Sequence, residues 1–495
     1  MEIRANTKIL GIRGITFDDV LLAPAYSEVL PHEVEVKSRF TRNFLVNAPL
    51  ISAAMDTVTG ADMAIAMARE GGVGVIHRNN TPEEQGLSVR KVKRAESEMI
   101  TDPICLTPEH SLLDVRKVME ENAISGVPIV ESFENKMLLG IITSRDLLFE
   151  DDFSLKVRDR MTSGEKLVKA TLGTTMAEAQ QILRKYKIEK LPIVDAEGRL
   201  QGLITMKDIL RRKQFPNAAK DNQGRLLVAA AIGVGREGFE RASVLLEAGA
   251  DVLVLDTAHG HSARVLETLS MIKEKFPHTD MVVGNIATPK ATEALIKAGA
   301  DAIKIGMGPG SICTTRIVAG IGVPQITAIV ECAKVAKRYG IPVIADGGIR
   351  YSGDIAKAIA AGADCVMIGS LLAGAEESPG ERVIFEGRAY KTYRGMGSES
   401  AMASRSSRER YGQEQEYELK PIAEGIEGRV PYKGTVKEIV FQLIGGVKSG
   451  MAYCGCRTIP EFQENARFIR VSQSSVVESH PHDVIITKEA RNYSR

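Results

Sequence analysis

A glycine-rich stretch with a single cysteine, residues 306–315, carries the residue types best suited to covalent chemistry. Its order is Gly-Met-Gly-Pro-Gly-Ser-Ile-Cys-Thr-Thr, and it follows the apolar run Ala302–Ile305. Glycines let the backbone approach a ligand closely and adopt positive φ, and the thiolate of an accessible cysteine is a nucleophile. Alone, such a stretch is more often a turn with a small, inert cysteine. The neighbouring elements therefore determine whether this stretch is an ordinary turn or a loop that presents a nucleophile.

Composition excludes several classes of protein. A chain of 495 residues is long enough for more than one domain, and a net charge of +1 predicts no nucleic-acid partner. The six cysteines form no regular framework, and Cys454-Gly-Cys456 lacks the spacing of a zinc site. No apolar run approaches the ~20 residues that span a bilayer or resembles a signal segment. We expect a cytoplasmic protein with reduced thiols and no membrane contact.

Alternating apolar runs and helical stretches predict the frame that positions the cysteine. The tetrapeptide Ala-Gly-Ala-Asp recurs at 248–251, 298–301 and 361–364, each time between a helical stretch and an apolar run, as expected of glycine at a helix C-terminus. The predicted strands are Leu50–Met55, Gly72–Ile76, Leu227–Ile232, Val252–Asp256, Met281–Asn285, Ala302–Gly306, Pro342–Asp346 and Cys365–Ser370. Short buried strands separated by helices indicate βαβ units, and eight units close a (β/α)8 TIM barrel. An open doubly wound sheet would need a glycine motif after its first strand, which the sequence lacks.

An insertion of about residues 96–213 interrupts this barrel, so that residues 1–95 and 214–495 form its two parts. The insertion repeats itself: Gly126–Val130 is echoed by Lys190–Val194, and Gly140–Leu147 by Gly202–Ile209. The shared Gly-x-x-Thr-x-x-Asp pattern with its Pro-Ile-Val strand resembles the CBS domain. The resemblance implies a tandem CBS pair, about 99–155 and 161–213, that binds adenine or guanine nucleotides.

Four residues of the two patterns are candidate ribose contacts of such nucleotides: Thr143, Asp146, Thr205 and Asp208. Threonine and aspartate at this spacing are equally typical of the cap of a following helix. Both interpretations stay open on the sequence.

The stretch from about 387 to 432 breaks the barrel pattern. It contains Tyr-Arg-Gly-Met-Gly-Ser at 393–398, the basic and serine-rich run Ser404–Tyr411, and a Glu/Gln run. Its low apolar content predicts a segment that packs no core, and long loops in compact enzymes are commonly lids or binding elements. We expect a mobile flap.

Reacting groups of a TIM barrel lie at the C-terminal ends of its strands. The residues at those ends are Met55, Asp256, Asn285, the cysteine stretch, Asp346-Gly-Gly348 and Gly369-Ser370. The last two groups follow the seventh and eighth strands, where glycine-rich turns and helix N-termini commonly bind phosphate. A phosphorylated small molecule is the expected ligand.

Four features together resemble the IMP dehydrogenase/GMP reductase family over nearly the whole chain. They are the Gly-x-Gly-Pro-Gly-Ser-Ile-Cys-Thr-Thr loop, Ala-Asp-Gly-Gly-Ile at 345–349, Tyr-Arg-Gly-Met-Gly-Ser at 393–398, and the CBS-like insertion after the second strand. The resemblance implies NAD-dependent oxidation of IMP to XMP, in guanine nucleotide synthesis. The reaction passes through a covalent cysteine thioimidate, which is then hydrolysed. A GMP reductase, or a nucleotide sensor with an inactive barrel, are the alternatives.

The same resemblance implies roles for individual residues. The catalytic residues are Cys313, which attacks C2 of the purine, the water-activating pair Arg410 and Tyr411, and Thr315. The substrate-binding residues are Met55, Ser311, Asp346, Gly348, Gly369, Ser370, Tyr393, Gly395, Met396, Gly397 and Glu424. The cofactor-binding residues are Asp256, Asn285, Gly306 and Gly308. Because arginine is a poor general base, a relay from Thr315 to Glu424 stays open as the alternative.

The family also binds K⁺ through backbone carbonyls, which implies a site at Gly308, Gly310 and Cys313. Glu478, Ser479 and His480 of a neighbouring subunit complete it, and a homotetramer follows. Carbonyl oxygens suit such a cation. His259 and His261 either lie near the adenine half of NAD or have a structural role.

Overall fold

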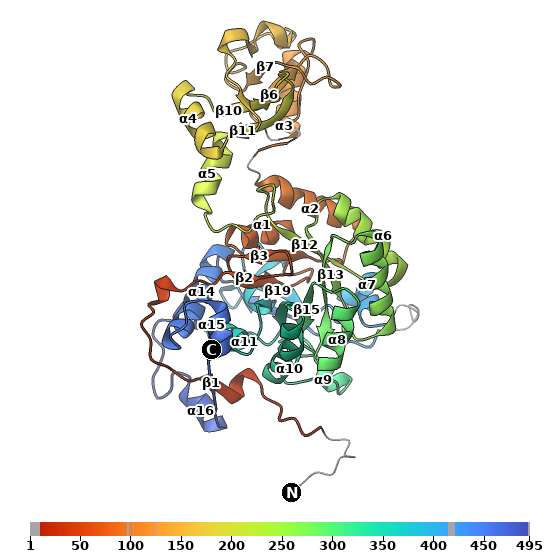
Figure 1. The fold of residues 1–495 in the computed structure, drawn as a ribbon, viewed down its shortest axis with the longest axis vertical. Helices are drawn as coiled ribbons and strands as arrows, with labels where there is room; N and C mark the ends of the chain where they lie inside the picture. Colours follow the sequence, from red (N-terminus) through yellow and green to blue (C-terminus); the bar gives the residue numbers. More distant parts are fainter. Residues whose placement is uncertain (1–9, 97–98, 102, 123, 414–420, 494–495) are drawn as a thin grey trace. The chain divides into compact units, whose positions relative to one another are not determined.

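The computed structural model describes residues 10–96, 99–101, 103–122, 124–413 and 421–493 (Figure 1). The chain divides into two compact units, which we describe one at a time. The first comprises Met1–Ala95, Asn217–Asp221 and Leu226–Arg495. The second comprises Glu96–Pro216 and Asn222–Arg225.

The first unit contains the predicted TIM barrel, which the structure confirms. Eight parallel strands close in the order β12-β13-β14-β15-β16-β17-β4-β5. They are β4 (Leu50–Ser52), β5 (Val73–Ile76), β12 (Val228–Ile232), β13 (Val252–Asp256), β14 (Asp280–Ile286), β15 (Ala302–Ile305), β16 (Val343–Asp346) and β17 (Cys365–Ile368). Every second residue of several strands, such as Val252 and Val254, belongs to one buried apolar cluster. Since side chains alternate along a strand, this cluster fills the barrel interior.

The repeated Ala-Gly-Ala-Asp joints have one structural role. Their glycines Gly249, Gly299 and Gly362 have φ values of 96°, 105° and 115°, which favour glycine. Each following aspartate accepts a backbone N–H at the start of the preceding strand: Asp251 from Val228 at 2.8 Å, Asp301 from Met281 at 2.9 Å and Asp364 from Val343 at 2.9 Å. The joint therefore ends a helix and fixes two neighbouring strands at the N-terminal end of the barrel.

Helices follow the strands around the barrel (Figure 1). They are α1 (Ala61–Arg69), α2 (Pro82–Ala95), α6 (Gly235–Glu247), α7 (Ala263–Lys275), α8 (Pro289–Lys297), α9 (Thr315–Val318), α10 (Gln325–Arg338), α11 (Ser352–Ala360), α12 (Ser370–Ala373), α14 (Val436–Tyr453), α15 (Ile459–Asn465) and α16 (Gln473–Glu478). Two small sheets lie outside the barrel: β1 (Val20–Leu22) with β21 (Phe468–Arg470), and β2 (Ser38–Arg39) with β3 (Leu45–Val46).

The segment predicted as a flap is more structured than we expected. It contributes to an antiparallel sheet of β18 (Arg382–Phe385), β19 (Arg388–Arg394) and β20 (Glu427–Pro431), and it contains helix α13 (Arg405–Arg410). The expectation that it packs no core is wrong for part of it, because Tyr393, Met396, Ala401 and Met402 are buried. Residues 414–420, with most of the Glu/Gln run, lie outside the described residues, and mobility stays a prediction.

The second unit contains two similar β-hairpins, each with a preceding helix. The first copy has α3 (Leu112–Glu121), β6 (Gly126–Val130), β7 (Leu138–Thr143) and β8 (Thr162–Ser163). The second has β9 (Ala170–Thr171), α4 (Met176–Tyr186), β10 (Lys190–Val194), β11 (Leu200–Thr205) and α5 (Met206–Gln214). The register shifts at the same place in both hairpins, at Ile129/Val130 and Ile193/Val194. The internal repeat of the sequence thus corresponds to two copies of one folded motif.

The four candidate ribose contacts bind one another in pairs. Thr143 donates through N and Oγ1 to Asp146 Oδ2 at 2.7 and 2.9 Å, and Thr205 does the same to Asp208 Oδ2 at 3.0 and 2.6 Å. This arrangement fits the alternative in which they close the turn or cap the helix after each hairpin. Nucleotide binding by this unit stays a prediction.

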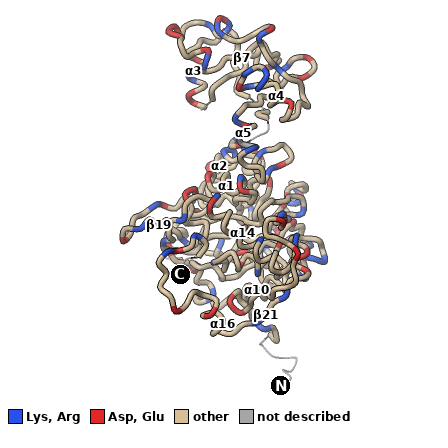
Figure 2. Tube along the Cα trace, turned by 90° about the vertical axis from the view of Figure 1, so that its left-hand side faces the viewer, with Lys and Arg blue, Asp and Glu red and all other residues tan. Residues whose placement is uncertain are grey.

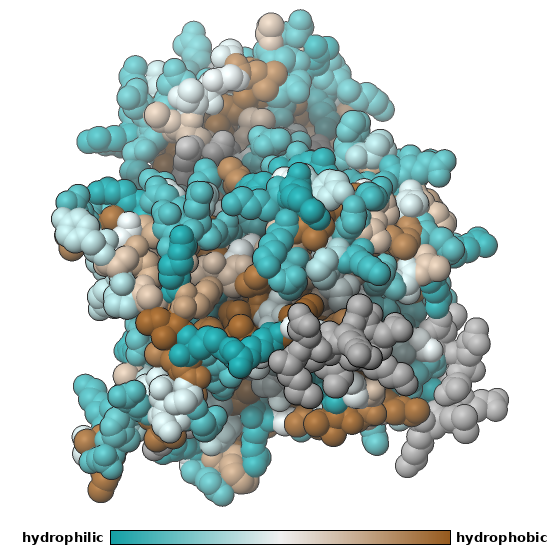
Figure 3. All heavy atoms as spheres, turned by 60° about the horizontal axis from the view of Figure 1, so that its bottom comes forward, coloured by the Kyte–Doolittle hydropathy of each residue, from teal (hydrophilic) through white to brown (hydrophobic). Residues whose placement is uncertain are grey.

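Charged residues of both signs are mixed along the described chain. Lysines and arginines are interspersed with aspartates and glutamates along the chain (Figure 2). One face shows brown hydrophobic patches among hydrophilic side chains (Figure 3). Among the described helices, none is both long enough and apolar enough to cross a membrane.

Candidate active site

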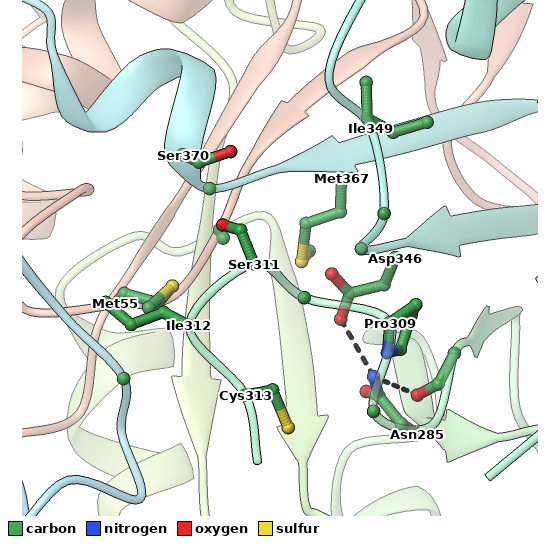
Figure 4. Close-up of a pocket in the computed structure, with 18 of the residues that line it drawn as sticks. Met55, Asn285, Pro309, Ser311, Ile312, Cys313, Asp346, Ile349, Met367 and Ser370 are labelled. Carbon is green, nitrogen blue, oxygen red and sulfur yellow. Dashed lines mark hydrogen bonds between the residues drawn. The ribbon is translucent and has the colours of Figure 1, made fainter. Parts of the chain in front are cut away.

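A cavity of about 370 Å³ opens at the C-terminal ends of the barrel strands. The cysteine loop after β15 crosses it, with Cys313, Ser311 and Ile312 on one strand of the loop and Asp346 and Asn285 opposite (Figure 4). This is the end of a TIM barrel at which catalytic groups gather. The cavity is therefore the candidate active site.

Most of the predicted residues line this cavity together. They are Met55, Asp256, Asn285, Gly306, Gly308, Gly310, Ser311, Cys313, Asp346, Gly348, Gly369, Ser370, Tyr393, Gly395, Met396, Arg410, Tyr411 and Glu424. Thr315 and Gly397 lie just behind the lining: Thr315 contacts Cys313, and the carbonyl of Gly397 accepts the N–H of Glu424 at 3.0 Å. Their roles stay predictions.

The cysteine loop is held by backbone pairing with residues 424–426. Thr314 N donates to the Glu424 carbonyl at 2.9 Å, and Ile426 N donates to the Ile312 carbonyl at 3.0 Å. The partly exposed Cys313 thiol donates to Thr315 Oγ1 at 3.2 Å. A fixed, accessible sulfur beside a hydroxyl is suited to nucleophilic attack on a bound ligand.

Two other cysteines of the barrel are unsuited to that role. Burial raises the pKa of Cys332 to about 11 and raises the pKa of Cys365 as well. Both therefore stay protonated near neutral pH, and both are fully buried. The sequence alone could not separate them from Cys313 except through the glycine-rich loop.

A buried lysine that we did not predict connects the polar residues of the cavity floor. Lys304 on β15 is 1% exposed, and its Nζ lies 3.0 Å from Asp256 Oδ1 and 2.8 Å from Asp346 Oδ2. It also donates to Asn285 Oδ1, while Asn285 Nδ2 donates to Asp346 at 2.9 Å and to the Gly306 carbonyl at 2.8 Å (Figure 4). The signal was present in the sequence: a lysine inside an apolar strand requires buried anionic partners.

The predicted water-activating pair reaches the same cavity from α13. The guanidinium of Arg410 forms an ion pair with Asp256, and within the described chain its buried Nε has no hydrogen-bond partner. Burial lowers the pKa of Arg410 while Tyr411 opposes that shift, and burial raises the pKa of Tyr411. Burial disfavours the charged forms of both side chains. Glu424 also lines the cavity, so the choice between Arg410 and the Thr315–Glu424 relay stays open.

Another end of the cavity is lined by glycine-rich turns and by hydroxyl side chains. Gly347 and Gly348 after β16 line the cavity and have φ values of 91° and 81°, a conformation that favours glycine. Ser311 and Ser370 present hydroxyls to this end (Figure 4), and burial raises the pKa of Tyr393, a shift that a hydrogen bond with Ser311 opposes. These groups are suited to a phosphate.

The N-terminal segment also reaches this end, which we did not predict. Thr16, Phe17 and Asp18 line the cavity, and Asp18 forms an ion pair with Arg350, which lines it too. No pattern in the sequence signals this contact, because it joins residues more than three hundred positions apart.

The remaining predicted residues lie elsewhere. His259 and His261 form an edge-to-face pair with ring centroids 6.5 Å apart and are not part of the cavity lining. Glu478–His480 lie at the end of α16, where the His480 ring and the Tyr493 hydroxyl are 2.8 Å apart. Since the prediction assigns these three residues to a neighbouring subunit's site, their position in one chain does not test it. No cluster of metal-ligating side chains occurs within the described ranges.

Comparison with known proteins identifies the family. The profile of the IMP dehydrogenase / GMP reductase domain matches residues 14–482. Inosine-5'-monophosphate dehydrogenase of Aquifex aeolicus is 58% identical over 482 residues, 97% of each chain, and that of Bacillus subtilis is 56% identical, covering 97% of this chain and 98% of its own. A GMP reductase variant of Trypanosoma brucei, solved with guanosine 5'-monophosphate, superposes with a TM-score of 0.86 at 41% identity over 96% of this chain and 98% of its own. The chain therefore belongs to the IMP dehydrogenase/GMP reductase family.

Proposed function

We propose that this protein oxidises IMP to XMP with NAD. The single observation that carries the proposal is the position of Cys313, held by backbone pairing at a cavity whose opposite end suits a phosphate. The named relatives support a dehydrogenase: those at 56–58% identity are IMP dehydrogenases, whereas the GMP reductase structure is 41% identical. The predicted activity, and not the GMP reductase alternative, is our conclusion.

The cavity residues divide into groups that fit the parts of IMP. Ser311, Gly348, Gly369, Ser370 and Tyr393 bind the 5'-phosphate through hydroxyls and turn N–H groups. Asp346 accepts hydrogen bonds from the ribose hydroxyls, with Lys304 and Asn285 fixing its carboxylate. Met55, Gly395, Met396, Gly397 and Glu424 surround the base.

Cys313 then acts on C2 of the base. Its thiolate adds to C2, which becomes tetrahedral and can release hydride. NAD, when bound, accepts that hydride, so IMP is oxidised and a thioimidate joins C2 to Sγ. Water gives one proton to the water-activating group and adds to C2, the C–S bond breaks, and XMP leaves with the thiolate restored. Covalent catalysis thereby divides one difficult oxidation into two easier steps.

The residues beside Cys313 fit a nicotinamide ribose on one side. Asp256 presents a buried carboxylate to the cavity, near Asn285, Gly306 and Gly308. In the structure Arg410 forms an ion pair with this same carboxylate. The arginine and a cofactor ribose therefore compete for Asp256, and a flap that returns after the cofactor leaves brings Arg410 and Tyr411 to the thioimidate for hydrolysis.

Three further features belong to the proposal. K⁺ binds the carbonyls of Gly308, Gly310 and Cys313 with those of Glu478, Ser479 and His480 from a neighbouring copy. Such a site requires contact between copies, for which we propose a homotetramer; the exposed apolar residues Ile317, Val318 and Ile321 beside the cysteine loop support an interface. The second unit is a CBS pair that takes adenine or guanine nucleotides, and the protein is cytoplasmic.

The experiment that tests the activity is a matched pair of assays. With IMP and NAD, absorbance of NADH should rise and XMP should accumulate; with GMP and NADPH, no consumption should occur. Mass spectrometry of the quenched reaction should find the purine on Cys313. The Cys313→Ala variant should bind IMP without turnover. Activity with GMP and NADPH alone would contradict the proposal.

A further inference from the structure

Helix α13, which carries Arg410, docks on the loop that follows strand β5. Arg78 Nη1 lies 2.9 Å from Glu409 Oε2, and these side chains are 6% and 9% exposed. The other carboxylate oxygen of Glu409 accepts the backbone N–H of Val234, after β12, at 2.6 Å. Glu409 directly precedes Arg410 in the chain. The residue before the proposed water-activating arginine is thus fixed to the loops that follow two neighbouring barrel strands, β5 and β12.

A second set of contacts joins the start of this helix to the same loop. The side-chain carbonyl of Asn79 accepts the hydroxyls of Ser404 and, at 3.3 Å, Ser407. Its amide donates to Asp56 Oδ2 at 2.6 Å. On the far side of the helix, the carbonyl of Arg410 accepts the N–H of Ala258 at 3.2 Å. The β5 loop therefore contacts both the first turn and the last turn of α13.

We infer that Arg78 and Glu409 are positioning residues for Arg410, and that their ion pair holds the flap closed over the cavity during hydrolysis. The inference rests on the proposed function. Neither side chain lines the cavity, so both act through the position of α13 and not on the substrate. A buried carboxylate that loses its cationic partner is strongly destabilised. Glu409 regains solvent when the flap opens, so loss of Arg78 favours the open flap.

The two steps of the reaction respond differently to this change. Hydride transfer occurs with the flap away from Asp256, because Arg410 and the cofactor compete for that carboxylate. Hydrolysis requires Arg410 and Tyr411 in the cavity. Breaking the Arg78–Glu409 pair therefore slows hydrolysis, leaves hydride transfer intact and strengthens apparent cofactor binding.

The kinetic test compares Arg78→Met, Glu409→Gln and the double variant with the unmodified full chain. Rapid mixing with IMP and NAD should give an NADH burst of about one per active site, followed by a steady rate about tenfold or more slower than in the unmodified protein. The KM for NAD should fall. The double variant should be no slower than the worse single variant, because one pair is lost in each case.

Two control variants separate positioning from general damage. Arg78→Lys keeps a cation beside Glu409 and should restore most of the steady rate. Glu240→Gln removes a carboxylate from the neighbouring helix α6, whose ion pair is with Arg236 of the same helix, and should change neither step.

A second readout does not depend on turnover. Arg408 is buried in the closed flap, so trypsin should cut after Arg408 or Arg410 about tenfold faster in Arg78→Met and Glu409→Gln, with IMP present and NAD absent. Arg78→Lys should be cut at the rate of the unmodified protein. The inference would be overturned if Arg78→Met and Glu409→Gln slowed hydride transfer and hydrolysis equally. It would also be overturned if both the rate of tryptic cleavage and the NADH burst kinetics were the same as in the unmodified protein. Absence of NADH from the unmodified protein would instead refute the proposed function.

Discussion

At the scale of single residues, accessibility separates Cys313 from the buried thiols of the barrel. Cys313 and Cys105 are partly exposed, whereas Cys332 and Cys365 are buried. Iodoacetamide at pH 8 should therefore modify Cys313 and Cys105, and IMP should protect Cys313 alone because only that thiol lines the cavity. Peptide mass spectrometry measures both. Modification of Cys313 should abolish turnover; retained activity after full alkylation would exclude it as the nucleophile.

His77, in the loop that contacts the flap, gives a prediction on pH. Burial lowers the pKa of His77, with Asp56 opposing, and its Nδ1 accepts the N–H of Asn79 at 3.1 Å. A histidine with a folded-state pKa below its unfolded value of about 6.5 contributes stability above pH 6.5, which is lost as the pH falls. His77→Asn should therefore show a smaller fall in the free energy of unfolding between pH 7 and pH 5. Urea titrations at both pH values measure it, and an identical pH dependence would contradict the assignment.

The buried ion pairs are the part of the site that the sequence does not predict. Cys313, Asp256 and Asp346 could be predicted from their positions in the glycine-rich loop and at strand ends, whereas Arg410 was implied by the family resemblance alone. Lys304 could not be placed against its two carboxylates, nor Arg78 against Glu409, because each ion pair joins elements far apart in the chain. Such ion pairs form only when the closed barrel brings the two elements together, so the local sequence does not indicate them.

At the scale of elements, strands were the most predictable part. Their continuous apolar runs reflect burial on both faces, and the Ala-Gly-Ala-Asp joints mark three of their starts. The flap sheet was not predicted, since β18, β19 and β20 carry mixed polar residues with few buried positions. These three strands pair with one another in a separate antiparallel sheet, and no local periodicity indicates that pairing.

The junction of β15 and the cysteine loop gives the prediction at this scale. Gly306 has φ 150°, and a Cβ there would collide with the carbonyl of Asp346. Gly306→Ala must move either the cysteine loop or the β16 turn, so it should lower stability by about 1–3 kcal/mol and weaken IMP binding at least tenfold. Urea unfolding and calorimetry with IMP measure these effects.

Gly353 in α11 is the matched control for that substitution. A Cβ at Gly353 meets nothing within 4 Å, and its φ is not positive. Gly353→Ala should leave IMP binding unchanged and stability equal or slightly higher, because alanine favours the helix. Equal effects of the two substitutions would show that the close approach at Gly306 does not matter.

At the scale of the whole molecule, the two chain segments that flank the second unit are both packed in the barrel unit. Lys93, near the end of α2, is buried and contacts Asp221 at 2.9 Å and Asp251 at 2.5 Å, and it also donates to the carbonyl of Leu226 at 3.0 Å. All four residues belong to the first unit. The segment before the insertion and the segment after it are therefore joined within the barrel itself.

This contact makes removal of the insertion a test of the domain boundary. Replacing Glu96–Pro216 with a short Gly-Ser linker keeps Lys93, Asp221 and Asp251, so the barrel should fold and turn over IMP within about threefold of the full chain. Lys93→Met in the full chain should be more damaging, lowering the free energy of unfolding by about 3–5 kcal/mol, because two buried carboxylates lose their cation. Urea unfolding and NADH production measure both proteins. An unfolded deletion protein beside a stable Lys93→Met variant would show that the second unit, and not the lysine, completes the barrel.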